Sequence, residues 1–253
     1  MTVEEGGEFW GWAGRTLEAP ARTAAGTAAW LRLVAVPEDK AFGKLWEGAW
    51  EAQHALGSLD GHRPALIGLH DATEDGTAYR AELSVRVDEP VLSTDPILQQ
   101  DLDLPGQWWT DLAHPLHKLA ATPTDRIAVR TQYMQRAIPQ FLDIPAPEAP
   151  CWNTAHADLH WANLTTPLRI LDWEGWGAAP AGFDAAMLYA YTLRCLATAA
   201  RVRETFPALG RSETLAAEAT VCAMLLQTVD RGDNLVLEYP LRMWAQEIRR
   251  RYP

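Results

Sequence analysis

The chain has few cysteines, and this scarcity limits the chemistry available to it. Only Cys151, Cys195 and Cys222 occur, odd in number and widely spaced. They offer neither a disulfide framework nor the paired spacing of a cysteine metal site. This cysteine usage fits a reducing cytoplasm.

Basic residues are outnumbered by acidic ones. The chain has 22 Lys and Arg against 33 Asp and Glu, which gives a formal net charge of −11 and a pI near 5.1. Binding to nucleic-acid phosphates requires clustered positive charge, so this balance argues against a nucleic-acid partner. The acidity suits a cationic small molecule, although solubility alone explains it equally well.

Long apolar runs and a targeting segment are also lacking. No apolar stretch approaches the roughly 20 residues needed to cross a bilayer. The acidic start MTVEEGGEFW has neither the basic nor the apolar part of a signal peptide. With 48% hydrophobic residues, the chain is expected to be a soluble, cytoplasmic globular protein without a membrane partner.

Residues 1–93 have the pattern of a small sheet with one helix. Two strand pairs are predicted, each around a short turn: GRTLEAPART with TAAWLRLVAV, and PALIGLHD with TAYRAELSVRV. Between the pairs, apolar side chains recur at helical spacing from Phe42 to Leu56, just before Gly57. This part is therefore expected to form a small, sheet-rich lobe.

A connector, VDEPVLSTDP, lies at residues 87–96, and the lobe at 94–253 is expected to be mainly helical. Helical periodicity covers PGQWWTDLAHPLHKLAA, then DRIAVRTQYMQRAIPQFL with Thr124 as its N-cap, then DAAMLYAYTLRCLATAARV, ETLAAEATVCAMLLQTV and PLRMWAQEIRRRY. The predicted fold class is α+β, with a reduced β-rich lobe at 1–93 and a larger helical lobe at 94–253.

The run HADLHWANLTTPLRILDWEGW, residues 156–176, gathers acids, an amide and imidazoles. Asp158 and Asn163 lie in an expected loop. Asp172 follows an apolar pair, which predicts a short strand that ends at this acid. Phosphoryl transfer needs an acid that orients a hydroxyl and oxygen ligands that hold magnesium. The run contains both.

The same run resembles the catalytic loop and metal-binding segment of the aminoglycoside phosphotransferase and choline kinase family. That family has a two-lobed, protein-kinase-like fold and phosphorylates small molecules. The matching elements, in order, are His156-x-Asp158 with Asn163, then Leu171-Asp172-Trp173-Glu174, then Gly182-x-Asp184. A lone HxD is a weak signal, whereas the ordered set is much stronger.

The resemblance implies a role for each matching residue. Asp158 is expected to be the catalytic base, and Asn163 and Asp172 are expected to bind Mg²⁺. The other implied roles are support of the loop by His156 and Asp184, and lining of the acceptor pocket by His160, Trp161 and Glu174. Core packing is the alternative for the tryptophan.

The family usually carries a strand lysine that grips nucleotide phosphates and pairs with a helix glutamate. The matching cation here is Arg32, which can contact phosphate in bidentate fashion, and Lys44 is the alternative. The helix partner stays open, because Glu47 and Glu51 lie off the apolar face of their helix and Gln53 lies on it.

The resemblance also places the nucleotide base against the connector between the lobes. Backbone groups around Ser84 and Val85, as far as Val87, are expected to read the adenine edge. The segment GWAGR does not form a full glycine-rich nucleotide loop. The loop that lies over the nucleotide phosphates is therefore expected to be shorter than in the family.

These features predict a Mg²⁺-dependent small-molecule kinase that transfers the terminal phosphoryl group of ATP or GTP to a hydroxyl of an aminoglycoside-like or other small acceptor. Two alternatives stay open: a degenerate nucleotide-binding regulatory or scaffold protein, and a kinase acting on Ser or Thr of a precursor peptide. A zinc site at His156, Asp158 and His160 is a weaker reading, because the other histidines form no comparable cluster.

Overall fold

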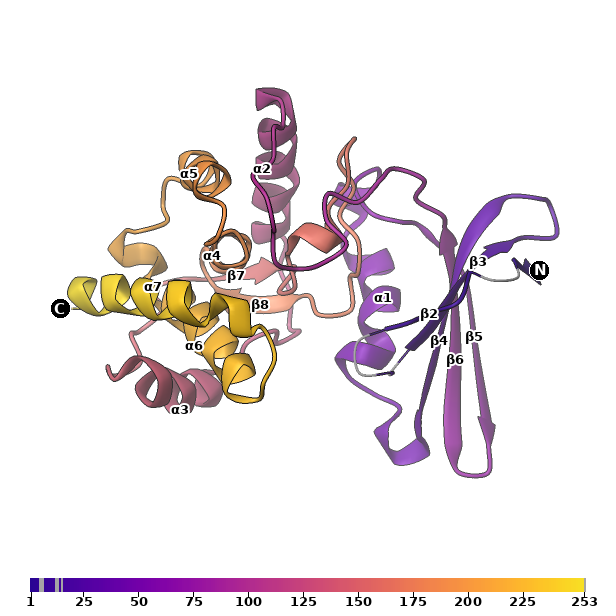
Figure 1. Cartoon of the computed structure of the whole chain (residues 1–253). Helices are drawn as coiled ribbons and strands as arrows, with labels where there is room; N and C mark the ends of the chain where they lie inside the picture. Colours follow the sequence, from indigo (N-terminus) through magenta and orange to yellow (C-terminus); the bar gives the residue numbers. More distant parts are fainter. Residues whose placement is uncertain (5–6, 12–13, 15, 253) are drawn as a thin grey trace. The chain divides into compact units, whose positions relative to one another are not determined.

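The protein divides into two compact units in a computed structural model that describes residues 1–4, 7–11, 14 and 16–252. Unit 1 comprises Met1–Glu89 and Arg169–Gly175, and unit 2 comprises Pro90–Leu168 and Trp176–Pro253. Unit 1 holds an antiparallel sheet and unit 2 is mainly helical, as Figure 1 shows. The predicted α+β class is confirmed, while the lobe boundary at residue 93 stays a prediction.

Unit 1 is built on a six-stranded antiparallel sheet. Its strands are β1 (Thr2–Val3), β2 (Phe9–Trp10), β3 (Thr16–Arg22), β4 (Ala28–Pro37), β5 (Leu66–Glu74) and β6 (Thr77–Val85). Their order is β1-β3-β4-β6-β5, and β2 pairs with β3. Both predicted strand pairs are confirmed, since β3 pairs with β4 and β5 pairs with β6.

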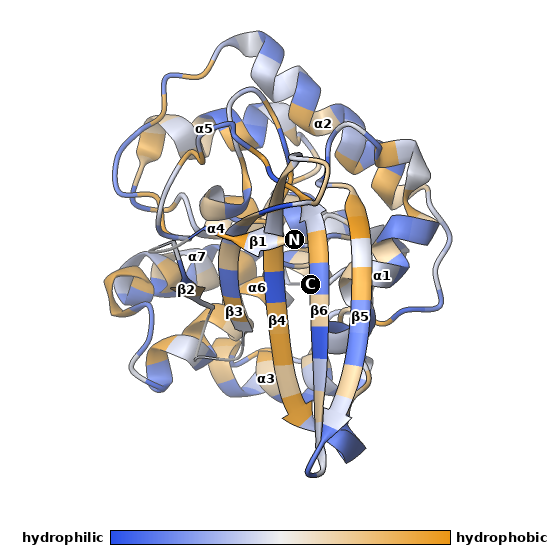
Figure 2. Cartoon of the chain, turned by 90° about the vertical axis from the view of Figure 1, so that its right-hand side faces the viewer, coloured by the Kyte–Doolittle hydropathy of each residue, from blue (hydrophilic) through white to orange (hydrophobic). Residues whose placement is uncertain are grey.

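The register of the two central strands brings two opposite charges together. β4 and β6 pair from Ala29↔Val85 to Pro37↔Thr77, so Arg32 lies directly opposite Glu82. In Figure 2 the mostly hydrophobic ribbon of β4 is crossed by a hydrophilic band, and β6 carries such a band beside it. A positive and a negative side chain therefore face each other across the two central strands, β4 and β6.

One helix, α1 (Lys44–Ala55), packs against this sheet and confirms the helix predicted from its periodicity. Its Trp46 joins Val34 and Ala78 in a buried cluster. The Glu47 carboxylate accepts a hydrogen bond of 3.0 Å from the backbone N–H of Gly43, which satisfies one of the donors left open at a helix start.

Unit 2 is formed by six α-helices and a short strand pair. The helices are α2 (Gly106–Ala120), α3 (Thr131–Leu142), α4 (Phe183–Ala190), α5 (Leu196–Thr205), α6 (Leu215–Asp230) and α7 (Glu238–Arg251), and the strands are β7 (Trp152–Ala155) and β8 (Gly177–Pro180). Helix α6 is buried along most of its length and packs against α3, α4 and α7. Among the described residues, no helix combines the length and the apolarity that a bilayer crossing requires.

Helix α3 begins later than predicted. Thr124 is not its N-cap: the Thr124 hydroxyl accepts a hydrogen bond of 3.1 Å from the backbone N–H of Arg126. The next residue, Ile127, forms a parallel bridge with Ala178 of β8. The start of the expected helix is therefore extended chain that pairs with a strand, and tertiary pairing overrides the helical periodicity.

The segment predicted as one helix from Asp184 onward is two helices, α4 and α5. The break comprises residues 191–195 and contains Thr192, which is fully buried. Its hydroxyl donates to the carbonyl of Leu188 and accepts a 3.0 Å hydrogen bond from the indole N–H of Trp161. A threonine that bonds back to the preceding turn weakens a helix. Because the bond to Trp161 spans 31 residues, local sequence could not reveal it.

Candidate active site

The loop after β7 is closed by its own hydrogen bonds. His156 is fully buried, and its ring Nδ1 accepts a 3.3 Å hydrogen bond from the backbone N–H of Asp158. The amide Nδ2 of Asn163 donates to the backbone carbonyl of Asp158 at 3.0 Å. The Asp158 side chain is nevertheless 43% exposed. The loop thus fixes the backbone of Asp158 and presents its carboxylate to solvent.

A buried carboxylate at the start of α4 supports this loop. The Asp184 oxygens accept hydrogen bonds of 2.8 Å from the backbone N–H groups of His156 and Ala157. Burial raises the pKa of Asp184 to about 6, although the two N–H bonds act to lower it. These are the contacts that the predicted bracing role requires.

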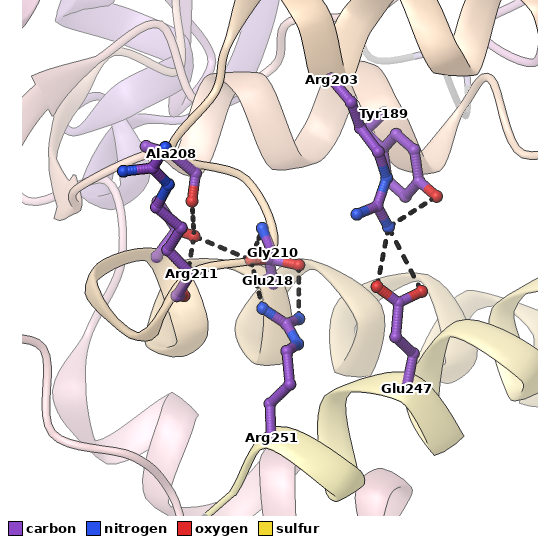
Figure 3. A network of polar contacts seen from close by, with 9 residues as sticks. Tyr189, Arg203, Ala208, Gly210, Arg211, Glu218, Glu247 and Arg251 are labelled. Atoms are coloured by element: carbon purple, nitrogen blue, oxygen red, sulfur yellow. Dashed lines mark hydrogen bonds and ion pairs between the residues drawn. The ribbon is translucent and has the colours of Figure 1, made fainter.

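A polar network centred on Glu218 of α6 lies elsewhere in unit 2 (Figure 3). Glu218, which is 1% exposed, accepts hydrogen bonds from the Thr214 hydroxyl at 2.8 Å and the Gly210 N–H at 2.9 Å. Arg251 forms an ion pair of 2.6 Å with the same carboxylate. A Cβ at Gly182, which has a φ of 88°, would approach the Thr214 methyl to 2.6 Å. Thr214, a member of this network, therefore packs closely against Gly182, the residue before α4.

One non-glycine residue in each of the two predicted site segments adopts the left-handed backbone region. Ala157, next to Asp158, has a φ of 67°, and Asp172 has a φ of 58°. Such conformations cost on the order of 1–3 kcal/mol each and persist only where the surrounding structure imposes them. The N–H bond from Ala157 to Asp184 supplies that constraint in the loop.

Asp172 does not end a strand, so that prediction is wrong. It precedes a turn within Arg169–Gly175, a segment that groups with unit 1. The backbone N–H of Ile170 donates to the carbonyl of His62 at 2.7 Å, and the indole N–H of Trp173 donates to the carbonyl of Ile170 at 2.7 Å. The apolar pair before Asp172 anchors an irregular segment and belongs to no ladder of strands.

The guanidinium of Arg32 lies among carboxylates. Its Nη1 is 2.8 Å from Glu82, its Nη2 pairs closely with Glu174, and its Nε is 4.0 Å from Glu18. The Glu174 carboxylate is thus engaged with Arg32 in unit 1, and its predicted place in the acceptor pocket stays a prediction. Burial raises the pKa of Glu82, and the charge of Arg32 opposes that rise.

Two polar side chains of helix α1, Glu47 and Gln53, form hydrogen bonds with residues other than Arg32. Glu47 caps its own helix, and the side-chain oxygen of Gln53 accepts from Arg63 at 2.9 Å and from the backbone N–H of Leu66 at 2.8 Å. Lys44 is the exposed first residue of the helix. The carboxylates that contact Arg32 come from β3, β6 and the 169–175 segment.

The backbone predicted to read adenine is partly engaged in the sheet. Ser84 pairs with residues of both neighbouring strands. The N–H of Val85 donates to the carbonyl of Ala65 at 2.8 Å, and the N–H of Arg86 donates to the carbonyl of Ala28 at 3.3 Å. Neither N–H is open to a base, so the contact would move to Val87 and beyond. Residues 12, 13 and 15 of the segment GWAGR lie outside the described residues.

His160, predicted at the acceptor pocket, lies close to Asp158. Its Nε2 is 3.8 Å from the Asp158 carboxylate and 3.3 Å from Nδ2 of Asn163. Its ring meets that of Tyr191 edge-on, with centroids 5.7 Å apart. Burial, together with the charge of Asp158, raises the pKa of Tyr191. Tyr191 was not predicted at the site, because it falls inside an apolar helical pattern.

Trp161 is a core residue, which corrects its predicted place at the acceptor pocket. Its side chain is fully buried. The ring lies against those of Trp108 and Trp109, with centroids 6.4 Å and 6.1 Å away, and its N–H donates to Thr192. No face of the indole is left for a ligand.

Each of the two predicted metal ligands offers an oxygen, the donor that Mg²⁺ prefers. Asn163 uses its amide nitrogen on the loop of unit 2, so its oxygen is the atom that remains for a cation. Asp172, in unit 1, offers a carboxylate. His156 turns Nδ1 toward its own loop. In the part of the chain that the structure describes, no three His, Cys, Asp or Glu side chains are grouped to hold a metal.

Unit 2 also contains a mostly apolar hollow of about 360 Å³. Asp184, Phe183 and Phe206 are among the described residues that line it, whereas Asp158 and Asn163 are not. The hollow therefore lies behind the support of the loop and does not coincide with the predicted acceptor pocket.

No model of a known protein family matches the chain, and no curated protein matches it. Solved structures do match over almost the whole length. Amicoumacin kinase hAmiN, in complex with AMP-PNP, Ca²⁺ and Ami, has a TM-score of 0.61 at 12% identity, covering 100% of this chain and 90% of that one.

Two further solved structures agree with this match. Aminoglycoside phosphotransferase APH(4)-Ia has a TM-score of 0.59 at 14% identity, covering 98% of this chain and 92% of that one. Choline kinase LicA from Streptococcus pneumoniae has a TM-score of 0.56 at 9% identity, covering 98% and 94%. The chain thus has the protein-kinase-like fold of small-molecule phosphotransferases, as its sequence predicted.

Proposed function

We propose that the protein is a small-molecule kinase. It transfers the terminal phosphoryl group of ATP or GTP to an alcohol hydroxyl, with Mg²⁺ as the metal. The observation that carries this proposal is the loop at 156–163, in which an exposed Asp158 carboxylate stands on a backbone fixed by His156, Asn163 and Asp184. The protein-kinase-like fold supports the same reaction.

Each residue has one task in this reaction. Asp158 accepts a hydrogen bond from the acceptor hydroxyl, aims its oxygen at the phosphorus and takes up its proton. Asn163 and Asp172 would hold the metal through oxygen atoms. Mg²⁺, when bound, neutralises charge on the phosphates. Catalysis then consists mainly of positioning and charge neutralisation, which explains why the loop is braced so firmly.

The acceptor is proposed to be an amine-bearing alcohol of the aminoglycoside-like kind. A net charge of −11 favours a cationic molecule. Solved proteins that share the fold act on amicoumacin and choline, according to their names. His160 and Tyr191, which flank Asp158, are the residues proposed to contact the acceptor. The three cysteines are free thiols, which suits a cytoplasmic enzyme.

An acceptor screen tests this function. Release of ADP or GDP is measured with a panel of aminoglycosides, choline-like alcohols, sugars, nucleosides and a Ser-containing peptide, with Mg²⁺ and with a chelator. We expect acceptor-dependent release that the chelator abolishes and that Asp158→Asn removes. Asp103→Asn, a change of the same kind at an exposed aspartate, is the control and should behave as wild type. Nucleotide binding without release for any acceptor would contradict the proposal.

A further inference from the structure

Arg32 stands at a site with an excess of negative charge. The guanidinium nitrogens of Arg32 lie 2.8 Å from the carboxylate of Glu82 and 4.0 Å from that of Glu18, and they also contact the carboxylate of Glu174. The carboxylate of Asp172 adds to the field at this cation. Glu82 is 4% exposed, so its carboxylate cannot turn away into solvent. A nucleotide polyphosphate that approached Arg32 would therefore meet more negative than positive charge.

The partner Glu174 is tied to α1 by its backbone as well. A Cβ at Gly48 would lie 2.2 Å from the carbonyl oxygen of Glu174 and 2.5 Å from its Cα. Real Cβ atoms do not approach other atoms so closely, so only glycine lets the segment pack on the helix at this point.

The beginning of the segment is fixed to unit 1 at separate points. Arg169 forms an ion pair of 3.1 Å with Glu89 and also contacts the carbonyl of Gly61. The backbone N–H of Ile170 donates to the carbonyl of His62. Asp172 lies between these ties and the pair of Glu174 with Arg32, and its left-handed backbone requires such restraint.

We infer that Arg32 is a positioning residue, which holds the Asp172 segment on the sheet by bridging Glu82 and Glu174, and that it does not serve as the phosphate grip. The role of the segment as a metal carrier rests on the proposed function. The bridge itself depends only on contacts within unit 1. A planar guanidinium can contact two carboxylates through separate nitrogens, which a lysine ammonium does less well.

Hydrogen exchange of the free protein tests the bridge. Amide exchange is measured in peptides covering residues 169–175 for Arg32→Met and Glu174→Gln. Both variants should exchange there faster than wild type, by about tenfold, because each leaves part of a half-buried charge cluster unpaired. The double variant should exchange no faster than the faster single variant, since both changes break one bridge. Arg22→Met, at an exposed ion pair with Glu4, is the control and should leave the segment unchanged.

Nucleotide binding without metal separates positioning from gripping. If Arg32 positions the segment, its guanidinium is engaged by carboxylates and does not contact the phosphates, so Arg32→Met should bind ATP in the presence of chelator within about twofold of wild type. When ATP binding is measured at increasing Mn²⁺, both Arg32→Met and Glu174→Gln should need a higher Mn²⁺ concentration than wild type to reach half-maximal ATP binding. A phosphate grip predicts opposite results: Arg32→Met would lose metal-free ATP affinity, and Glu174→Gln would gain it. That pattern would overturn the inference.

Gly48→Ala provides a test that changes no charge. The added methyl should displace Glu174 and accelerate exchange of the same peptides. Gly57→Ala, where a Cβ would meet no atom within 4 Å, is the matched control. If amide exchange of residues 169–175 were unchanged in Arg32→Met and Glu174→Gln, the inference would be refuted, even if the protein proved to be an active kinase. Faster exchange in a protein that transfers no phosphate would uphold the bridge and refute the proposed function, so the two failures are distinguishable.

Discussion

The two segments that hold the proposed catalytic and metal-binding residues are restrained in different ways. The Asp158 loop in unit 2 is held by neutral backbone N–H groups that converge on one buried carboxylate, Asp184. The Asp172 segment in unit 1 is held by ion pairs of Arg32 and Arg169 and by close packing on Gly48. Both restrain a residue in the left-handed region. A strained backbone can thus be fixed either by hydrogen bonds or by charge and contact.

The largest effect is expected at the exposed acid of the hydrogen-bonded loop. Asp158→Asn should lower kcat by at least about 10³-fold, because the amide cannot take up the hydroxyl proton. The melting temperature should change little, since the side chain is 43% exposed and its backbone makes the structural bonds. Steady-state kinetics and a thermal melt check the two halves of this prediction. A variant that turned over normally would remove Asp158 from the mechanism.

The next largest effect is expected at a buried ion pair of unit 2, away from the Asp158 loop. Arg251→Met should destabilise the protein by roughly 3–5 kcal/mol, because it leaves Glu218 buried without its cation. Denaturant unfolding measures the loss. Glu247→Gln, which removes the half-exposed partner of Arg203, is the control and should cost no more than about 1 kcal/mol. Equal losses in the two variants would mean that burial does not decide the strength of these pairs.

The support of the loop should show in the pH dependence of stability. The pKa of Asp184 rises from 3.8 to about 6 on folding because the carboxylate is buried. Between these values the folded state binds more protons, so wild-type stability should fall as pH rises through this window. The difference is on the order of 3 kcal/mol.

Asp184→Asn removes the titrating carboxyl group. The unfolding free energies of the wild type and this variant are compared from about pH 4 to about pH 7. The advantage of the wild type over the variant should shrink as pH rises. An advantage that grew with pH would show that the two N–H bonds outweigh burial and lower the pKa of Asp184.

The smallest effect concerns the helix break beside the loop. Thr192→Val keeps the shape of the side chain and removes the oxygen that accepts the N–H of Trp161. The buried donor left unpaired should cost about 1–3 kcal/mol of unfolding free energy. Denaturant titration checks the value. Thr110→Val, at an exposed helix position, is the control, and an equal change in both variants would show that the buried bond contributes nothing.

Sequence patterns predicted the elements that depend on neighbouring residues. The two strand pairs and α1 follow from alternation and helical periodicity, and they formed as expected. The HxD loop was recognisable because its residues are close together in the chain. The division of the long helix at Thr192 was missed, since it involves a distant tryptophan.

The contacts of the site were harder to predict than its elements. The pairing of Arg32 with Glu82 requires the register of two strands, which sequence alone does not fix. Its pairing with Glu174 joins residues 142 positions apart. Trp161 was expected at a pocket because it lies within the loop, but apolar bulk is buried wherever the core has room for it.

Calorimetric titration of ATP with and without Mg²⁺ tests the central claim most directly, on wild type, Asp158→Asn and Asp172→Asn. The claim is that Asp158 aims the hydroxyl while Asp172 holds the metal. Mg²⁺ should therefore strengthen ATP binding to wild type and Asp158→Asn alike, and should lose that effect in Asp172→Asn. An Asp172→Asn protein whose ATP affinity still rises with Mg²⁺ as in wild type would contradict the account.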